Sequence, residues 1–341
     1  MHKFKYKNML VLLLLLMFVL TGCSGKKFIL TTGFGGDEVF RIDGEKCELK
    51  EVLVYLVNME NQYKAMYGDE FVSVSINDIP ITSYLKESAL AMVYKVRIMN
   101  LMAETYDITL TGEEKDRIKN AAQEYYDSLS KEERSAMGGV SKGDIQRMYE
   151  EYAIAEKLYE YLIKDVNPEI SDDDARTVVL KEIFISSSQD VSANSAQSPA
   201  DIANEAYTKA MLEEDFDLLV AQYSDRDDSL VYVRKGELAT NLETVVFNMS
   251  EGDISQVLNG MDGYYIFYCV NAADASRTEA NKQEIIQQRR DQAFNSVYSS
   301  FAAERKYYLN EELWNDFEIP DGENVITASF FEVFDSYFYI D

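Results

Sequence analysis

The spacing of apolar residues changes twice along the chain, and this change constrains the fold more than any other feature of the sequence. Apolar residues recur at helical spacing from about Leu49 until Pro168 ends the pattern. The pattern then becomes that of a strand over 177–185, followed by further short elements. Helical spacing resumes at Thr278 and continues to about Trp314. Such a helix needs a partner for its apolar face, and the early helices are the natural candidate. The sequence therefore predicts an α+β protein in which a helical domain is split around an inserted α+β domain.

Individual elements follow from the same spacing and from their ends. Thr111 and Glu114 form a capping box that opens a helix to about residue 129, and Ser141 caps the next one. The last twelve residues contain six aromatic side chains, which either pack onto the body or form an apolar tail. The remaining predicted helices cover 49–66, 83–106, 201–212 and 216–223, with a helical turn at 242–247, and the remaining strands cover 231–233, 254–258 and 264–270.

The N-terminus has the layout of a secretory leader. Three lysines precede an unbroken apolar run over 9–20, which at 12 residues is too short for a membrane span of ~20. Leu20-Thr21-Gly22-Cys23 follows, and it resembles the bacterial lipobox, in which the cysteine carries a lipid. The sequence therefore predicts a signal peptide over 1–22, lipidation of Cys23, a tether over 23–45 and a protein anchored on the extracytoplasmic face of the cell membrane. An ordinary signal peptide is the alternative.

Charge and histidine content exclude several classes of function. The single histidine, His2, lies in the predicted leader, so the mature chain has no imidazole. This excludes a Ser-His-Asp triad, a Cys-His pair and a His-ligated metal, and we expect neither metal nor cofactor. The net charge of −27 argues against nucleic-acid binding, because such a field repels phosphate backbones. The acid excess favours solubility, or a bias toward basic or unfolded partners.

Two cysteines remain beyond the lipobox, Cys47 and Cys269. Outside the cytoplasm they could form a disulfide, but their separation along the chain says little about geometry. We expect two buried free thiols, with the disulfide as the alternative.

Three stretches of the insert carry a family resemblance. The first is Asp215 to Asp225 (DFDLLVAQYSD), the second is Val246 to Ser255 (VFNMSEGDIS), and the third is Gly263 to Ile266 (GYYI). In order and spacing they resemble the conserved stretches of parvulin-type prolyl isomerases. The order of segments resembles extracytoplasmic foldases of the PrsA and SurA type. The resemblance implies a helical chaperone-like domain over 46–170, a parvulin-like domain over 171–277, and a C-terminal long helix and aromatic tail over 278–341 that complete the helical domain.

The resemblance also assigns site residues. Parvulins carry a histidine near the end of the first strand, where this chain has Glu182, and a second in the third motif, where it has Tyr265. Glu237 stands at the family's acidic or cysteine position. The resemblance thus implies Glu182, Glu237 and Tyr265 as catalytic candidates, and Leu242 and Phe247 as residues of the proline pocket. Two neighbouring glutamates would repel each other unless one is protonated.

The expected function is a membrane-anchored folding factor that binds unfolded or newly exported polypeptides, with isomerase activity weak or lost. Prolyl isomerisation breaks no covalent bond, so histidine is not chemically obligatory, and a fully active isomerase is the first alternative. A lipoprotein that binds solutes is the second alternative, although it normally needs two α/β lobes. Dimerisation through the helices stays open.

Overall fold

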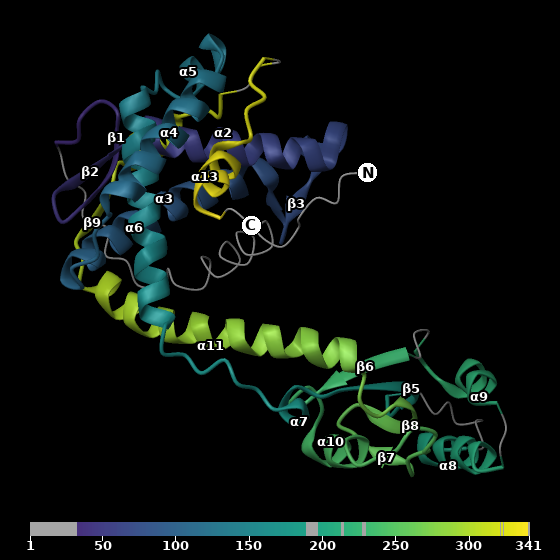
Figure 1. Cartoon of the computed structure of the whole chain (residues 1–341). Helices are drawn as coiled ribbons and strands as arrows, with labels where there is room; N and C mark the ends of the chain where they lie inside the picture. Colours follow the sequence, from purple (N-terminus) through teal and green to yellow (C-terminus); the bar gives the residue numbers. More distant parts are fainter. Residues whose placement is uncertain are drawn as a thin grey trace. The chain divides into compact units, whose positions relative to one another are not determined.

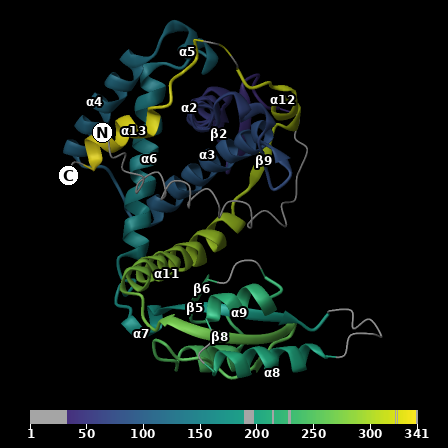
Figure 2. The same cartoon turned by 90° about the vertical axis from the view of Figure 1, so that its right-hand side faces the viewer.

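The chain forms two compact units in a computed structural model that describes residues 33–188, 197–212, 215–226, 230–320, 322 and 324–339. Unit 1 comprises Met1–Asp165 together with Ala293–Asp341, and unit 2 comprises Val166–Gln292 (Figures 1 and 2). The structure is 58% helical and 15% strand. These observations confirm the predicted α+β class with an insert, and two α/β lobes are not what the described residues form. The predicted leader over 1–22 and Cys23 lie outside the described residues.

Unit 1 is mainly helical, and a capping box begins each of the helices α2 (Leu49–Tyr67), α4 (Gly112–Ser128), α5 (Lys131–Ala136) and α6 (Lys142–Ile163). The side-chain oxygen of Thr111 accepts from the Glu114 backbone N–H at 3.2 Å, and the Glu114 carboxylate accepts from the Thr111 N–H, which confirms that capping box. Across the described residues of both units, none of the helices is both long enough and apolar enough to span a membrane. The helices of unit 1 are α2 (Leu49–Tyr67), α3 (Ile81–Thr105), α4 (Gly112–Ser128), α5 (Lys131–Ala136), α6 (Lys142–Ile163), α12 (Glu311–Asp316), α13 (Phe330–Phe338), the 3-10 helix η2 (Gly68–Ser73) and the end of α11 (Ala275–Ala303).

A small antiparallel sheet joins the two sequence parts of unit 1. Its strand order is β2 (Glu45–Glu48), β1 (Glu38–Ile42) and β9 (Tyr307–Leu309), and a separate hairpin pairs β3 (Ser75–Ile76) with β4 (Ile79–Pro80). Asp43 and Gly44 turn the β1–β2 hairpin with φ angles of 50° and 101°.

This sheet corrects two expectations. The tether was expected to reach residue 45, but β1 lies in the core, with Phe40 and Ile42 each 1% exposed. Residues 38–42 are therefore part of the core of unit 1 and not of a tether. The long C-terminal helix was expected to reach about Trp314, but α11 ends at Ala303 because the following residues form β9 against β1.

The aromatic C-terminus packs onto the body of unit 1 as α13. Phe330 and Phe334 are fully buried, and the ring of Phe330 lies 4.6 Å from that of Tyr149. The Tyr149 hydroxyl donates to the Phe330 carbonyl at 2.6 Å, and the Phe330 N–H donates to Asn58 Oδ1 at 3.1 Å. Of the two alternatives for these residues, the structure thus shows the packed one.

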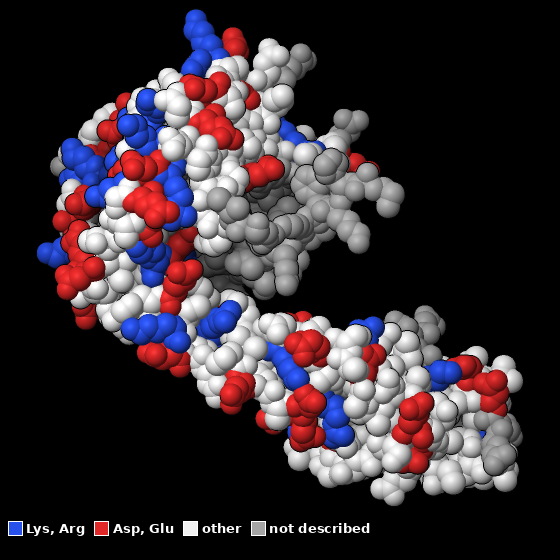
Figure 3. All heavy atoms as spheres, viewed as in Figure 1, with Lys and Arg blue, Asp and Glu red and all other residues white. Residues whose placement is uncertain are grey.

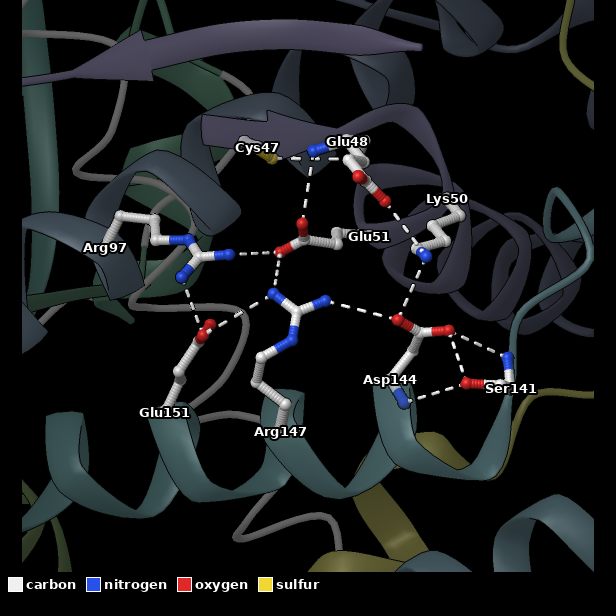
Figure 4. A network of polar contacts seen from close by, with 9 residues as sticks. All are labelled: Cys47, Glu48, Lys50, Glu51, Arg97, Ser141, Asp144, Arg147 and Glu151. Atoms are coloured by element: carbon white, nitrogen blue, oxygen red, sulfur yellow. Dashed lines mark hydrogen bonds and ion pairs between the residues drawn. The ribbon is translucent and has the colours of Figure 1, made fainter. Parts of the chain in front are cut away.

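A buried ion network connects α2, α3 and α6 (Figure 4). The Arg97 guanidinium pairs with Glu51, whose side chain is 2% exposed, and its Nη1 lies 2.6 Å from Glu151 Oε1. Arg147 Nη1 approaches the same Glu51 oxygen at 3.3 Å. Burial raises the pKa of Glu151 to about 7, although the nearby arginines oppose this shift. Cys47 lies beside the network as a buried free thiol, and its pKa is raised by burial.

Unit 2 is a four-stranded antiparallel sheet that carries helices on both faces, and its strand order is β6 (Leu230–Arg234), β5 (Thr177–Ser186), β8 (Gly263–Asn271) and β7 (Leu258–Asn259). The strand expected over 254–258 is reduced to a single bridge from Ile254 to Tyr268 and the two-residue β7. Cys269 is a buried free thiol of β8, so both expected free thiols are confirmed. The elements are α7 (Asp172–Ala175), β5 (Thr177–Ser186), α8 (Pro199–Ala210), α9 (Phe216–Tyr223), β6 (Leu230–Arg234), α10 (Thr240–Val246), β7 (Leu258–Asn259), β8 (Gly263–Asn271) and the start of α11.

Acidic and basic side chains alternate over the surface in view, with no large area of one sign (Figure 3). The acid excess of 60 over 33 is therefore dispersed on that face rather than gathered into a patch. Such a distribution is typical of surfaces that maintain solubility.

Candidate functional site

The candidate site lies on one face of the unit 2 sheet, at the centre of β5 and β8. Side chains alternate between the faces of a strand, so Glu182 and Phe184 share a face, as do Tyr265 and Phe267. The register pairs Glu182 with Phe267 and Phe184 with Tyr265, which places all four side chains side by side. The opposite face is covered by α8 and α9 through a separate apolar cluster.

Gly263 allows the two strands to approach closely at this point. A Cβ at Gly263 would lie 2.2 Å from the Ile185 carbonyl oxygen, and one at Gly260 would lie 2.5 Å from the Tyr265 ring. Both positions therefore require glycine for close approach rather than for an unusual φ. The glycine of the third motif thus fixes where Tyr265 stands relative to Phe184.

The structure brings Glu182 and Tyr265 together through a residue that the sequence analysis missed, Arg226. Its Nη1 donates to Glu182 Oε1 at 2.7 Å, and its Nη2 donates to the Tyr265 hydroxyl at 3.3 Å and to Asp262 Oδ2 at 3.1 Å. The Tyr265 hydroxyl in turn donates to Asp262 Oδ1 at 2.6 Å. The four side chains form one connected cluster, with two carboxylates, one guanidinium and one phenol.

Arg226 reaches this position because the end of the first motif lies along β5, beyond the stretch of β5 that pairs with β6. The Phe184 N–H donates to Ser224 Oγ at 3.2 Å, the Asp225 N–H donates to the Phe184 carbonyl at 2.7 Å, and Asp225 Oδ2 accepts from the Ser186 N–H at 2.7 Å. These bonds attach Ser224 and Asp225 to the edge of β5, and Arg226 is the next residue. The Ser-Asp pair of the motif was therefore the available signal for Arg226.

Glu237 does not join the cluster, which corrects the expected three-residue network. It is exposed in the loop after β6, and its carboxylate accepts from the Arg234 N–H at 2.8 Å. Arg234 pairs with Thr177, five positions along β5 from Glu182, or roughly 17 Å at strand spacing. Glu237 caps the end of β6 and lies too far away to act with Glu182.

The two predicted pocket residues belong to the apolar cluster on the site's face. Leu242 of α10 is 4% exposed and Phe247 is 9% exposed, and both cluster with Phe184, Tyr265 and Phe267. Arg176 Nη2 also donates to the Phe247 carbonyl at 2.8 Å. Leu242 and Phe247 therefore lie on the site's face and present little apolar surface to solvent, and their role in a proline pocket stays a prediction.

Burial and pairing act on the ionisation of the cluster in opposite directions. Burial raises the pKa of Glu182, while Arg226 partly offsets this effect. Burial also raises the pKa of Tyr265, with a further contribution from its bond to Asp262, and that same bond lowers the pKa of Asp262. Since isomerisation transfers no proton, such a cluster can act only by binding a peptide carbonyl or amide.

No cluster of three or more histidine, cysteine or acidic side chains suited to a metal ion occurs in the part of the chain that the structure describes. The side chains around Arg226 pair with one another instead. The Glu182 carboxylate is bonded to Arg226, and the Asp262 carboxylate is bonded to Tyr265.

Comparison with known proteins identifies the domain that carries this site. Residues 183–271 match the family model described as "Rotamase: PPIC-type PPIASE domain". Unit 2 therefore contains a parvulin-type prolyl isomerase domain, which confirms the resemblance. A search of curated proteins gives no match to the chain.

Several solved structures are similar to this chain. The prolyl isomerase PrsA of Bacillus cereus is 17% identical with a TM-score of 0.36, and the match covers 77% of this chain and 97% of that one. A SurA-like chaperone of Campylobacter jejuni is 12% identical with a TM-score of 0.29, covering 80% and 99%. The foldase PrsA of Streptococcus pneumoniae is 17% identical with a TM-score of 0.25, covering 78% and 98%. Because these TM-scores are low, the family assignment rests on the domain match.

Proposed function

We propose that the protein is a folding factor anchored on the extracytoplasmic face of the cell membrane, which binds unfolded exported polypeptides and has weak or no prolyl isomerase activity. The observation that carries this proposal is the site of unit 2. It belongs to a parvulin-type domain, and Arg226 ties together Glu182 and Tyr265, the two residues that the resemblance assigns to the family's histidine positions.

The low isomerase activity follows from what catalysis requires. An isomerase must bind the twisted prolyl amide more tightly than the planar one, with an apolar surface for the ring. Here the side chains of that surface are nearly closed to solvent, since Phe184 and Tyr265 are 6% and 7% exposed. The polar groups that could bind the amide already satisfy one another. A mutually paired charged cluster of this kind, over a ring surface that is closed to solvent, favours retention of the domain for binding over turnover.

Client binding is supported mainly by unit 1. Met66, Val72 and Ile79 are exposed apolar side chains near the end of α2 and on the following η2 and β4 segment, with Val72 82% exposed. Such residues can contact the apolar segments of an unfolded chain. The anchor is supported by the lipobox ending at Cys23, and the acid excess supports basic or unfolded partners.

Two activity assays and a cell fractionation test the proposal. The purified chain is assayed for isomerisation of a proline-containing peptide and for suppression of aggregation of an unfolded protein. Cells that produce the wild-type chain or the Cys23→Ser variant are separated into membrane and soluble fractions. We expect suppression near equimolar ratio, an isomerisation rate close to that of the uncatalysed peptide, and loss from the membrane fraction only for Cys23→Ser.

Activity in neither assay would overturn the proposal. Strong isomerisation would instead favour the alternative of a fully active prolyl isomerase, whose rate should then fall in Glu182→Ala and Tyr265→Phe without unfolding.

A further inference from the structure

We propose that Arg226 closes the parvulin site: its guanidinium occupies the apolar surface on which a prolyl ring would pack, and its removal opens the domain to proline-containing peptides. The inference deepens the proposed function and rests on it, because it names the residue that keeps isomerase activity low. Neither the family motifs nor the expected catalytic residues include this arginine.

The guanidinium of Arg226 contacts the aromatic rings of the site. The guanidinium carbon of Arg226 lies 3.7 Å from the centre of the Phe184 ring and 5.5 Å from that of Tyr265. At 3.7 Å the guanidinium is in van der Waals contact with the ring face, so a substrate ring cannot stack there at the same time. Phe184 is consequently 6% exposed, although it lies at the centre of the site's face.

Three partners from separate places hold the guanidinium down. Glu182 comes from β5, Tyr265 from β8 and Asp262 from the turn before β8, and each is bonded to Arg226. Its backbone N–H also donates to Ser224 Oγ at 3.3 Å, next to the bonds that attach this segment to β5. Arg226 is therefore held at both its backbone N–H and its guanidinium.

The side chain nevertheless lies at the surface. It is 42% exposed, while its main partner Glu182 is 6% exposed. Moving Arg226 outward would leave Glu182 buried without its cation, which is costly, so the closed arrangement is favoured. Asp262 is 57% exposed and is screened by water, so it adds less to this preference.

A purely structural role for Arg226 predicts a different outcome. If the arginine only neutralises Glu182, replacing both charges together should leave the domain folded with no gain in peptide binding. If it covers the site, the double replacement should expose Phe184 and Tyr265 to a substrate. The double variant Arg226→Ala/Glu182→Gln therefore distinguishes the two, and it avoids the unpaired carboxylate that the single variant Arg226→Ala leaves.

The test uses the full chain in three forms: wild type, the single variant Arg226→Ala and the double variant. Isomerisation of a proline-containing peptide and its binding are measured, with thermal melting as the check on folding. We expect kcat/KM or peptide affinity to rise about tenfold, as when one apolar ring gains a packing surface. Arg277→Ala is the matched control, because its guanidinium also lies over a ring in unit 2, 3.5 Å from the centre of Tyr232, and we expect no change.

Folded variants that bind and turn over the peptide no better than wild type would overturn the proposal, as would weaker binding, which would make Arg226 a substrate contact. Aggregation suppression by the wild-type chain is scored separately. Its absence would contradict the proposed function. The gain in isomerisation or peptide binding in the variants tests only whether Arg226 covers the Phe184 ring.

Discussion

Arg97 holds two carboxylates of unit 1 at once. Glu51 and Glu151 come from different helices, and Glu51 is almost fully buried where the guanidinium meets it (Figure 4). The Nε of Arg97 has no hydrogen-bond partner among the described residues, so the geometry is not ideal for this side chain. Removing one member of a buried pair leaves the other charge uncompensated, which costs more than the pair itself contributes.

We therefore expect Arg97→Ala to lower the free energy of unfolding of unit 1 by about 3–5 kcal/mol. Trp314 is the single tryptophan and is buried in unit 1, so its fluorescence during urea denaturation reports this unit selectively. Lys142→Ala is the control, because Lys142 makes only an exposed bond to Gln123 at 2.8 Å and should change stability by less than ~0.5 kcal/mol. If Arg97→Ala does not fold, Arg97→Lys should fold with an intermediate loss. A loss below ~1 kcal/mol for Arg97→Ala would contradict this account.

At the residue scale, the family resemblance singled out Glu182 and Tyr265 but not their partner Arg226. Alignment with a family pattern gives the residue at each position, and strand alternation then places both on one face. Arg226 and Asp262 lie in loops, where no period exists to indicate a direction. Glu237 was grouped wrongly because the pattern along the sequence does not contain the register of β6 on β5.

The contact between α6 and α13 contains two carboxyl groups with raised pKa values, so we expect the packing of α13 onto unit 1 to depend on pH. Burial raises the pKa of Glu156 on α6 to about 7 and that of Asp335 on α13 to about 6. Glu160 and Glu332 add like charge, while Tyr339 and Tyr152 bond to Glu156 and partly oppose the shift. The folded state therefore favours the protonated carboxyls.

The sign of the pH dependence follows from these raised values. The stabilising contribution is fully present below the unfolded pKa values of 4.5 for Glu156 and 3.8 for Asp335. It is lost as the pH rises through about 6 for Asp335 and about 7 for Glu156. Between pH 5 and pH 8 we expect these groups to lower the stability of unit 1 by on the order of 2 kcal/mol, allowing for partial solvent screening. Glu156→Gln should reduce that dependence and stabilise the protein at pH 8, as monitored by Trp314. Glu70→Gln, on the exposed surface of η2, should leave the dependence unchanged. Equal pH dependence in wild type and Glu156→Gln would refute the assignment.

At the element scale, long periodic helices could be predicted and short strands could not. The helices α2, α3, α4 and α6 lie where the apolar spacing indicated them, within a few residues. β1, β2 and β9 were missed because each has five residues or fewer, and β1 and β9 are joined only by long-range pairing. The Asp43-Gly44 turn was a local signal for the first hairpin.

On the scale of the whole molecule, unit 2 is continuous in sequence and has its own two apolar clusters. The start of α11 belongs to it, since the Thr177 N–H donates to Thr278 Oγ1 at 3.2 Å and Asn281 donates to the Ala175 carbonyl at 2.8 Å. The split helical unit could be predicted from the return of helical spacing alone, whereas the position of each boundary could not, because α11 contributes to both units.

We expect a fragment spanning residues 166–292 to fold cooperatively on its own, as shown by circular dichroism and dispersed NMR signals. A fragment of residues 166–274 lacks Thr278 and Asn281 and leaves the Thr177 N–H and the Ala175 carbonyl without these partners, so it should be less stable by about 1–3 kcal/mol. An unfolded longer fragment, or equal stability of the two, would contradict this view of unit 2.

β9, Trp314 and α13 follow unit 2 in the sequence but belong to unit 1, so unit 1 is completed after unit 2. Unit 2 has all its residues once residue 292 has been synthesised, but unit 1 acquires the Phe330 and Phe334 rings of its core only when α13 has been synthesised. A product shortened by one stop codon or one proteolytic cut near its C-terminus would keep an intact isomerase domain. It would also leave Tyr149 and its aromatic neighbours open to water, which marks the shortened chain for degradation. Synthesis through α13 is thus the condition for a complete core of unit 1.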